Sequence, residues 1–492
     1  MTDPRVASAH LPWHVDVTDA VVPAEVDPLA WDRAWFDLAA QEAGEAVNLT
    51  EDRRVGHTWL RAPERAPEPG IAAQIADAQD AVRDLADGVL GRRIRCEDGR
   101  PFQQVLHIGI GGSALAPQLI TSALASPEGL PIETLDNVDP DGIARTLHRL
   151  GPRLETTLVL VASKSGGTVE TREATRLVRA AIEARGTSFR KHAVAITMPG
   201  SSLSREAGDW LAQVPIWDWV GGRFGATSAV GLLPAALAGA DTTELLAGAA
   251  EMDAWTRRTA WNQQPAALLA ASWHAAAQRG HDVVLLPYCD RLGLLGRFAQ
   301  QLVMESLGKR EDRAGQTVER GLTIYGNKGS TDQHAYVQQL RDGRYDALTT
   351  FVAVLDDGAS DATSTGDLLH GFLAGTRRAL RERGRATATI LVDRLDARGL
   401  GGLIALLERA VGLLASLWDI NGYDQPGVEA GKRAATAVLT DLETLHRRLA
   451  AGPVHEADLL HGTGDPSEVR HLLLRLAATG RVVRDGAHWR TR

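Results

Sequence analysis

Short apolar runs alternate with longer helix-forming stretches from residue 101 onward, and this alternation most constrains the fold. The first four runs, each ending in small or polar residues, are 102–112, 131–140, 156–167 and 191–200. Stretches rich in Ala, Leu and Arg separate them and are long enough to form helices. Strand–helix repeats of this kind predict a parallel, doubly wound α/β sheet. Ligands bind such sheets at the carboxyl ends of strands, so motifs located there carry most weight.

A second set of apolar runs predicts a second sheet of the same class. Its members are 281–290, 320–327, 347–357 and 386–394. A chain of 492 residues is also too long for one ordinary core. We therefore expect a helical N-terminal segment (1–100), a first α/β domain (101–240), a helical link (241–280), a second α/β domain (281–450) and a helical tail (451–492).

Composition limits the classes of function that are open to the chain. The formal net charge of −9 argues against nucleic-acid binding as the main task, although a local basic pocket remains possible. Cys96 and Cys289 are the two cysteines, which suits a reducing compartment and offers no metal cluster. The N-terminus lacks the layout of a signal peptide, and no uninterrupted apolar stretch reaches membrane-spanning length. We expect a soluble, cytoplasmic protein without a membrane partner.

The first predicted strand ends in the glycine-rich segment HIGIGGSALAP. Gly109, Gly111 and Ala114 satisfy the dinucleotide fingerprint G-x-G-x-x-A. Asp136 or Asp139 could then hold a ribose, so a nicotinamide site stays open. The same glycines could instead allow a helix to pack closely on the sheet, and the pattern alone does not choose.

The loop SKSGGT follows the third predicted strand and offers a cradle for an anion. Ser163, Ser165 and Thr168 supply hydroxyl groups. Lys164 supplies a positive charge, and the following helix supplies the positive end of its dipole. The GK[ST] ending of a Walker loop is absent, which disfavours nucleotide hydrolysis. A turn with one capping hydroxyl would not account for four polar groups in six residues, so the loop predicts a phosphate site.

A carboxylate lies on the apolar face of the helix predicted over residues 292–309. Glu305 shares that face with four apolar side chains, namely Leu294, Leu295, Phe298 and Leu302. Gln301 lies one turn earlier. A charge in this position is costly unless it is paired or used, which makes Glu305 a candidate general base. The alternative is a helix end at which the carboxylate reaches water.

His334 lies in a segment that is predicted to start a helix. Ser330 and Gln333 have capping-box spacing, which would place His334 in the first turn. The helix dipole disfavours a charged imidazole there, so a neutral ring suited to proton transfer is expected. The sequence contains no His-x-His pair and no HExxH motif, so it favours no metal site.

Two cationic residues have simpler explanations when each is taken alone. Arg223 lies in a glycine-rich loop, where a salt bridge would account for it. Lys432 lies one turn after Glu429 on a predicted helix, which is the spacing of an ordinary surface ion pair.

Six of these motifs, in this order along the chain, resemble those of the glucose-6-phosphate isomerase family. They are GIGGS (109–113), SKSGGTVET (163–171), GGRF (221–224), QLVMESLGK (301–309), STDQHAYVQQLRDG (330–343) and QPGVEAGK (425–432). The resemblance implies two flavodoxin-like sugar-isomerase (SIS) domains that work without metal or organic cofactor. It also implies a homodimer whose composite active sites lie at the subunit interface.

The resemblance further implies a role for each motif residue. Glu305 would move a proton between C2 and C1 with Gln301 beside it, and Arg223 would stabilise the enediolate. His334, from the neighbouring subunit, and Lys432 would assist ring opening. The residues against the sugar phosphate would be Gly112, Ser113, Ser163, Lys164, Ser165 and Thr168.

The expected reaction is reversible isomerisation of glucose 6-phosphate and fructose 6-phosphate through a cis-enediolate. Two departures from the family pattern leave the identity of the sugar substrate open. The loop SKSGGT is less threonine-rich than is usual in the family, and Leu307 stands where a small or polar residue is usual. Mannose 6-phosphate or a 6-sulfonated sugar are alternative substrates. A non-catalytic SIS sensor of sugar phosphates is a further alternative, which the intact catalytic set disfavours. We expect a sugar phosphate as the partner, and no nucleic acid.

Overall fold

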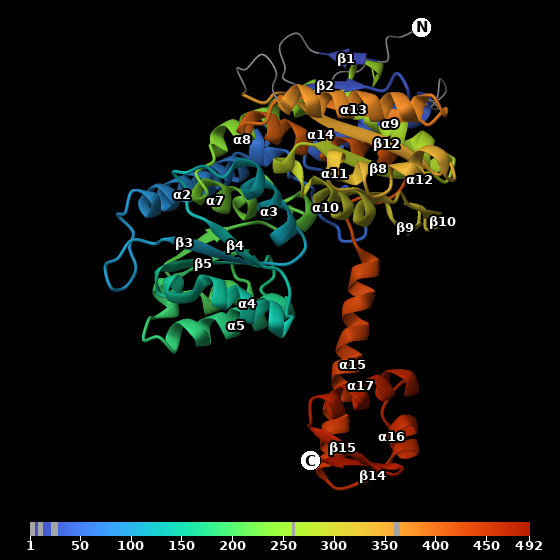
Figure 1. Cartoon of the computed structure of the whole chain (residues 1–492). Coiled ribbons are helices and arrows are strands. Elements are labelled where there is room, and N and C mark those ends of the chain that lie inside the picture. The colour runs from blue at the N-terminus through green and yellow to red at the C-terminus, as the bar shows by residue number, and fades with distance from the viewer. Residues whose placement is uncertain (1–4, 8–12, 21–27, 258–260, 359–364) are drawn as a thin grey trace. The chain divides into compact units, whose positions relative to one another are not determined.

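The computed structural model describes residues 5–7, 13–20, 28–257, 261–358 and 365–492. Contacts divide the chain into two compact units, Met1–Asp424 and Gln425–Arg492, each with its own hydrophobic core. The larger unit contains two α/β sheets, which Figure 1 shows with the helices that cover them.

The first sheet has five parallel strands in the order β4-β3-β5-β6-β7. Because β3 lies between β4 and β5, the winding direction reverses at the β3–β5 pair, as in other doubly wound sheets. The four predicted strands of this sheet are confirmed, and one further strand, β7, was missed. The strands are β3 (Gln104–Ile108), β4 (Ile132–Leu135), β5 (Thr157–Ala162), β6 (Ala193–Thr197) and β7 (Ala212–Pro215).

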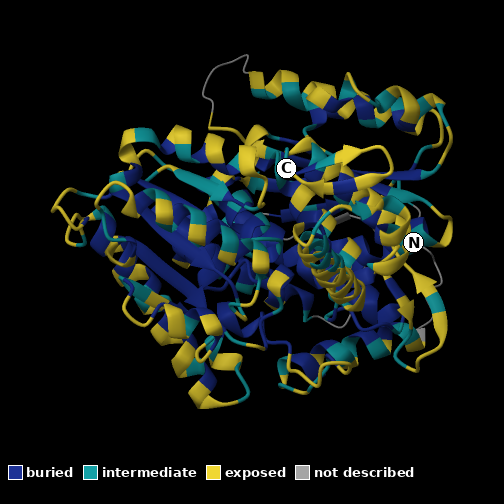
Figure 2. Cartoon of the chain, turned by 90° about the horizontal axis from the view of Figure 1, so that it is seen from below, coloured by how far each residue is buried: buried dark blue, intermediate teal, exposed yellow. Residues whose placement is uncertain are grey.

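Helices cover both faces of the first sheet because alternate strand residues point to opposite sides. Leu106 and Val159 belong to one hydrophobic core, whereas Val105 and Leu160 belong to another. The three central strands, β3, β5 and β6, are fully buried, whereas the edge strands β4 and β7 are partly exposed, and Figure 2 shows buried strands flanked by helices with exposed outer sides. The covering helices are α3 (Gly112–Leu124) and α7 (Ala229–Leu237) on one side, and α4 (Pro140–Leu150), α5 (Val169–Glu183) and α6 (Ser202–Glu206) on the other.

The second sheet has six strands in the order β1-β2-β13-β12-β8-β11. Its last four strands are parallel, and the winding reverses at the β8–β12 pair. Two N-terminal strands extend it in antiparallel fashion, with β2 paired to β13. The N-terminal segment, expected to be helical, therefore also contributes to this sheet. The strands are β1 (Arg5–Ala7), β2 (Trp13–Asp16), β8 (Asp282–Tyr288), β11 (Ile324–Tyr325), β12 (Ala347–Asp356) and β13 (Thr387–Arg394).

One long apolar helix, α14 (Ala397–Leu417), forms the centre of the larger unit. Its length and composition would suit a membrane span, but 94% of its most apolar window is buried inside the fold. It packs against α8 (Thr242–Thr256), α9 (Pro265–Gln278) and α1 (Pro28–Glu42). A helix that is apolar on all sides is expected in such a position. The remaining elements of this unit include α2 (Pro69–Leu90), α10 (Leu295–Gln300), β9 (Lys309–Glu311), β10 (Thr317–Arg320), α11 (Gly329–Gln333), α12 (Val337–Asp342) and α13 (Thr365–Arg381).

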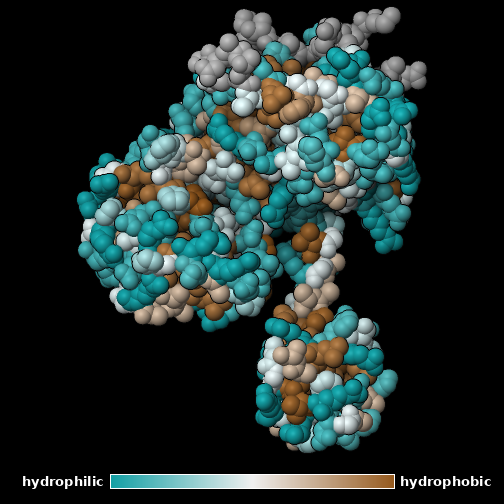
Figure 3. Space-filling view, viewed as in Figure 1, coloured by the Kyte–Doolittle hydropathy of each residue, from teal (hydrophilic) through white to brown (hydrophobic). Residues whose placement is uncertain are grey.

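The second unit is a small mixed domain, whereas the sequence predicted only helices after residue 450. It holds a three-stranded antiparallel sheet in the order β14-β16-β15. Hydrophilic and hydrophobic side chains share its visible surface (Figure 3). The elements are α15 (Pro426–Ala450), β14 (Val454–His455), α16 (Glu456–Gly462), α17 (Pro466–Ala478), β15 (Val482–Asp485) and β16 (His488–Thr491).

Candidate active site

The loops after β3 and β5 lie at neighbouring carboxyl ends, at the winding reversal of the first sheet. The first loop leads into α3 and contains Gly112 and Ser113. The second runs from Ser163 to Thr168 and leads into α5. This edge of a doubly wound sheet is the expected position of a ligand site.

Glycines in the first loop allow close contact with two other predicted motifs. Gly111 has a φ of 56°, and a Cβ atom there would lie 3.0 Å from Nε2 of Gln301. A Cβ atom on Gly112 would collide with the backbone of Gly222 and Arg223. These contacts account for two glycines of the GIGGS motif, Gly111 and Gly112, by packing within the chain, and they bring the GIGGS, GGRF and QLVMESLGK motifs together.

The second loop is shaped by its own hydroxyl groups. The Ser163 side chain is buried, accepts a hydrogen bond from the Gly166 N–H at 3.2 Å and donates one to Thr168 Oγ1 at 3.3 Å. Ser165 Oγ accepts a hydrogen bond from the Gly167 N–H at 3.1 Å. Ser165 is exposed and Thr168 is half-buried at the N-terminus of the 15-residue helix α5. The loop thus combines hydroxyl groups with the positive end of a helix dipole, the donor set that an anion needs.

Lys164 connects this loop to the segment that precedes Arg223. Its ammonium group donates hydrogen bonds to the carbonyl oxygens of Asp218 and Val220, at 3.2 and 3.1 Å. Burial lowers the pKa of Lys164 from its ordinary value, and the positive charges of Arg53 and Arg223 lower this pKa further. The lysine charge therefore belongs to the same electrostatic environment as Arg223.

Arg223 lies in the short 3-10 helix Gly222–Phe224 and is almost fully buried. Its Nε donates to Ser306 Oγ at 2.6 Å, and its Nη2 donates to the carbonyl oxygens of Gly422 and Asp424, at 2.7 and 3.0 Å. Nη1 lies 3.7 Å from Oε2 of Glu305. Burial lowers the pKa of Arg223, and the nearby Glu305 carboxylate opposes this effect. The guanidinium is thus fixed in one orientation beside the predicted base.

Gln301 and Glu305 bracket a π-helical segment, Gln301–Glu305, that follows α10. The sequence predicted a continuous α-helix here, so the π-helix is a correction. Such segments often occur at functional sites. With about 4.4 residues in each turn of a π-helix, residues four apart lie on the same side. Glu305 keeps 18% of its side chain exposed and reaches Arg223 from this side of the helix.

Lys309 lies beside the predicted site residues, and the sequence analysis did not single it out. It is buried, and its Nζ donates to the carbonyl oxygens of Glu305, Ser306 and Asp424, at 2.8, 3.0 and 3.2 Å. Burial and the neighbouring Arg223 charge lower the pKa of Lys309 to about 8. Its presence in the QLVMESLGK motif, four residues after Glu305, was the available signal.

His334 does not lie where the sequence predicted. Helix α11 begins at Gly329 and ends at Gln333, so His334 follows the helix instead of occupying its first turn. The predicted capping box is also absent, because Gln333 Nε2 donates to Thr376 Oγ1. The dipole argument for a neutral ring therefore fails. His334 is exposed, and within the described residues no hydrogen bond or ion pair joins its side chain to Glu305 or to the loop 163–168.

Lys432 lies on α15 in the second unit, where it is exposed. Its Nζ forms an ion pair with Glu429 at 2.8 Å, as the spacing of the two residues predicted. A role for Lys432 in ring opening stays a prediction.

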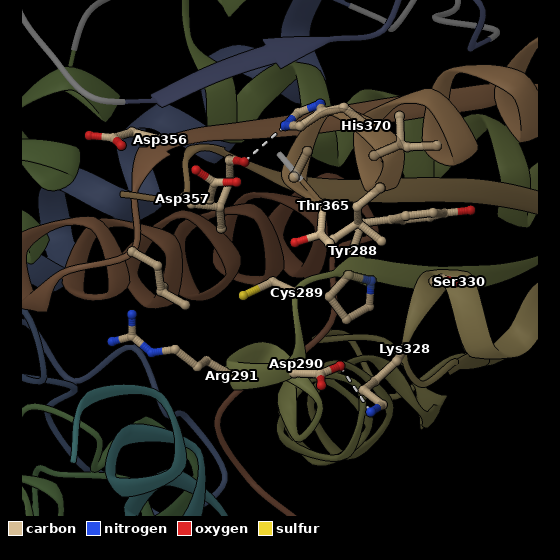
Figure 4. A pocket seen from close by; sticks show the side chains of 18 of the residues that line it. Tyr288, Cys289, Asp290, Arg291, Lys328, Ser330, Asp356, Asp357, Thr365 and His370 are labelled. Carbon is tan, nitrogen blue, oxygen red and sulfur yellow. Dashed lines mark hydrogen bonds and ion pairs between the residues drawn. The ribbon is translucent and has the colours of Figure 1, made fainter. Parts of the chain in front are cut away.

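A separate cavity of about 890 Å³ lies at the winding reversal of the second sheet, at the carboxyl ends of β8 and β12. Two of its polar side chains make the contacts drawn as dashed lines in Figure 4: Lys328 pairs with Asp290 at 2.9 Å, and the His370 ring lies 3.0 Å from the backbone oxygen of Val354. None of the predicted site residues is among its described lining residues. Across the described parts of the chain, no group of three or more His, Cys, Asp or Glu side chains is arranged to hold a metal ion.

Comparison with known proteins identifies similar sequences and similar solved structures over most of the chain. The family model described as phosphoglucose isomerase matches residues 37–384 and 379–452. A glucose-6-phosphate isomerase of Geobacter sp. (strain M21) is 49% identical over 465 residues, which cover 91% of this chain and 88% of that protein. One of Synechococcus sp. (strain JA-3-3Ab) is 53% identical over 432 residues, with 85% and 81% covered. The crystal structure of a glucose-6-phosphate isomerase from Chlamydia trachomatis D/UW-3/Cx matches with a TM-score of 0.80 and 25% identity over 89% of each chain.

Proposed function

Because the chain belongs to the phosphoglucose isomerase family and catalyses the isomerisation of glucose 6-phosphate, we propose that Glu305 is the base that moves the proton between C2 and C1. The observation that supports this role most strongly is the 3.7 Å approach of Arg223 Nη1 to Glu305 Oε2. A carboxylate that reaches both carbons from one face can remove and return the same proton. The adjacent guanidinium stabilises the negative charge that develops on the enediolate oxygens.

The reaction is balanced within the substrate, so the residues need to move only protons. The C2–H proton passes to Glu305, and a proton returns from Glu305 to C1. A second proton leaves the C2 hydroxyl and one is added at O1, so the aldehyde is reduced as C2 is oxidised. Reversal of these steps gives glucose 6-phosphate from fructose 6-phosphate, as glycolysis and gluconeogenesis require, and we place the reaction in the cytoplasm.

The phosphate of the substrate is assigned to the loop Ser163–Thr168. The hydroxyl groups of Ser165 and Thr168, together with the start of α5, supply donors for a dianion. Gly112 and Ser113 lie at the adjacent strand end, from which they contact the sugar phosphate. Gln301 lies against the first loop and orients the sugar over Glu305. Binding the phosphate away from the reacting carbons holds these carbons at the base.

Ring opening needs a second acid–base pair, for which we propose His334 and Lys432. His334 is exposed at the end of α11, which suits a residue that serves the site of a neighbouring subunit. A closed two-fold homodimer would then form two composite sites at once.

Subunit complementation tests the composite site. Inactive Glu305→Gln and His334→Ala proteins are mixed, dissociated gently and reassociated, with exchange followed by mass spectrometry of differently tagged chains. Random reassortment makes about half of the dimers mixed, and each mixed dimer holds one intact site, so activity returns to about a quarter of wild type. Verified exchange without recovery of activity would show that His334 serves its own subunit.

Assays on purified protein test the substrate and reaction. Turnover of glucose 6-phosphate and fructose 6-phosphate should exceed turnover of mannose 6-phosphate and of a 6-sulfonated glucose. Reactions run in deuterium oxide should place deuterium on the product carbon, because Glu305 exchanges its proton with solvent. Turnover of a sulfonated sugar above that of glucose 6-phosphate, or no turnover of any of these sugars, would reject the assignment.

A further inference from the structure

The second unit contains a folded region beyond the part of the chain that matches the phosphoglucose isomerase family. The match to the phosphoglucose isomerase model ends at residue 452, whereas β14, α16, α17, β15 and β16 all lie beyond it. These elements enclose their own core with the end of α15, including Leu449, Leu459, Leu473 and Trp489. The second unit therefore has its own order of elements (helix, strand, helix, helix, strand, strand), which differs from the strand–helix repeats of the two α/β sheets.

Helices α16 and α17 form a helix-turn-helix. The turn between them consists of Thr463, Gly464 and Asp465, a three-residue connection that contains glycine. Asp465 caps α17 by accepting hydrogen bonds from the N–H groups of Ser467 and Glu468. A short turn of this kind is typical of the DNA-binding helix-turn-helix, in which the second helix enters the major groove.

A β-hairpin lies beside the second helix. Strands β15 and β16 pair in antiparallel fashion around a turn with Gly486 at a φ of 58°. Arg484 from this hairpin lies 2.8 Å from the Glu456 carboxylate, and Arg470 from α17 lies 3.9 Å from the same carboxylate. One carboxylate between two arginines leaves a net positive charge where the hairpin meets α17.

The charge of the chain is unevenly distributed. Residues 466–492 contain six arginines against two acidic residues, a net charge of +4. The second unit as a whole, residues 425–492, contains ten basic and eight acidic residues, a net charge of +2, so residues 1–424 carry −11 when the whole chain carries −9. All six arginines are exposed. The overall negative charge, which argued against nucleic acid at first, conceals a basic surface that is complementary to a polyanion.

The outward face of α17 has the pattern of a helix that reads a groove. Arg470 and Arg475 are five residues apart, so they lie on either side of this face. Between them lie His471 and Leu474, of which Leu474 is 55% exposed. Arginines at the edges of such a helix reach phosphates, while the side chains between them reach base edges and thymine methyl groups.

We propose that the second unit binds double-stranded DNA, with α17 in the major groove and the β15–β16 hairpin along the adjacent phosphate backbone. Arg470 and Arg475 contact phosphates on either side of the groove, and Arg484 contacts the backbone from the hairpin. Leu474 and His471 face the bases. Because the rest of the chain is strongly acidic, binding is salt-sensitive and of modest affinity.

Fluorescence anisotropy of the full-length protein with a labelled mixed-sequence duplex of two helical turns tests this proposal. We expect binding at about 50 mM salt that weakens as salt rises, with a log–log slope near −0.9 for each phosphate contact, or about −3 for three arginines. Arg470→Gln/Arg475→Gln should make this slope shallower by about 2 and weaken binding about tenfold or more. The matched control Arg279→Gln/Arg344→Gln removes the same charge from exposed positions in the larger unit and should leave the slope unchanged.

Two further arms separate DNA from other occupants. Leu474→Glu changes an exposed side chain on the outward face, so the unit should remain folded by circular dichroism while duplex binding is lost. Isomerase activity should be unchanged in all of these variants. The labelled duplex should be bound more tightly than the single strand of the same length or polyglutamate. Three results would each overturn the proposal. They are no duplex binding at low salt, an equal loss of duplex binding in the control variant, and binding of polyglutamate as tight as binding of the duplex. The last result would indicate an acidic protein partner.

Discussion

Nη1 of Arg223 lies 3.7 Å from Oε2 of Glu305, and the rest of the same guanidinium is bonded to Ser306 and to two backbone carbonyl oxygens. The two residues are 82 positions apart in the sequence: Arg223 lies in a 3-10 helix that follows the strands of the first sheet, and Glu305 lies in a π-helix that follows β8 of the second. Because Gly112 has no side chain, the loop after β3 can lie directly against the Gly222–Arg223 backbone, where a Cβ atom would collide. Glu305 and Arg223 are therefore held beside each other by contacts within the larger unit.

Arg223→Lys should lower kcat about 10²- to 10³-fold while changing KM much less. A lysine retains the charge but cannot bond Ser306, Gly422 and Asp424 at once while facing Glu305. Steady-state kinetics with glucose 6-phosphate measure both parameters, and thermal unfolding controls for loss of structure. A folded Arg223→Lys protein with wild-type kcat would show that the fixed guanidinium is not used in the reaction.

Ser165→Ala/Thr168→Ala should lower kcat/KM about 10- to 100-fold, with effects on both KM and kcat. Hydrogen bonds to the phosphate both bind the substrate and position its carbons over Glu305. Ser202→Ala is the matched control. Ser202 Oγ donates to the carbonyl oxygen of Ser165, so this variant removes a nearby hydroxyl group that is not one of the proposed phosphate donors. If the double variant is kinetically indistinguishable from this control, the loop does not bind phosphate.

Lys309 should impose an alkaline limit on kcat near pH 8. Its ammonium group supplies three donors to the carbonyl oxygens of Glu305, Ser306 and Asp424, and the neutral amine has only two. The wild-type pH profile should therefore fall above about pH 8, where burial places this pKa. Lys309→Met should have a lower kcat and should lack this limb.

Deprotonation of Lys309 should lower kcat but raise the free energy of unfolding. This difference separates a loss of activity caused by Lys309 from a loss caused by alkaline unfolding. Its pKa is lower in the folded state than the ordinary value of 10.5, so the unfolded chain binds more protons between pH 8 and 10.5. This group therefore makes the free energy of unfolding rise with pH in that window, and the contribution is complete above pH 10.5. A fall of kcat that coincides with a fall of Tm between pH 8 and 10 would contradict the assignment to Lys309.

Asp253→Asn should reduce the free energy of unfolding by about 3–5 kcal/mol. Asp253 is fully buried between Arg61, at 2.6 and 2.8 Å, and Arg409, at 2.5 Å. These arginines hold its pKa well below the ordinary range, although burial alone would raise it. Removing the charge leaves two buried guanidinium groups without this counter-ion. The control Asp141→Asn breaks an exposed pair with Arg145 and should change the free energy of unfolding by less than about 1 kcal/mol. Equal losses of stability for the two variants in chemical denaturation would show that the buried Asp253 charge does not stabilise the fold.

Local patterns predicted the strands and the loops at their ends, because both depend on neighbouring residues. The run Leu158–Ala162 is a continuous apolar stretch, as a buried parallel strand requires, and the run Gln104–Ile108 is apolar except for Gln104 and His107. The pairing of β2 with β13 was not predictable in this way, because it joins segments about 375 residues apart and has no local signal. The short strands β14 to β16 were missed for a related reason, since two to four residues do not establish a periodicity.

The candidate site was predictable in its residue types but not in its supporting contacts. Glu305 and Arg223 were identified by motif, whereas the carbonyl oxygens of Gly422 and Asp424 that orient Arg223 carry no residue-type signal. The π-helix at Gln301–Glu305 depends on packing rather than on apolar spacing, so the sequence predicted an ordinary helix. His334 was placed in a helix because a capping pattern was present, but Gln333 bonds Thr376 instead.

The central claim is that Glu305 carries the proton between C2 and C1, and Glu305→Gln tests it most directly. The amide has nearly the same shape but cannot accept the proton, so kcat should fall about 10²- to 10⁴-fold while the Kd for glucose 6-phosphate, measured by calorimetry, stays close to wild type. The control Glu311→Gln makes the same change on the exposed strand β9 and should leave turnover intact. Incorporation of deuterium from solvent into the substrate should stop together with turnover in Glu305→Gln. Continued turnover or continued exchange at near wild-type rates would contradict the assignment of the base.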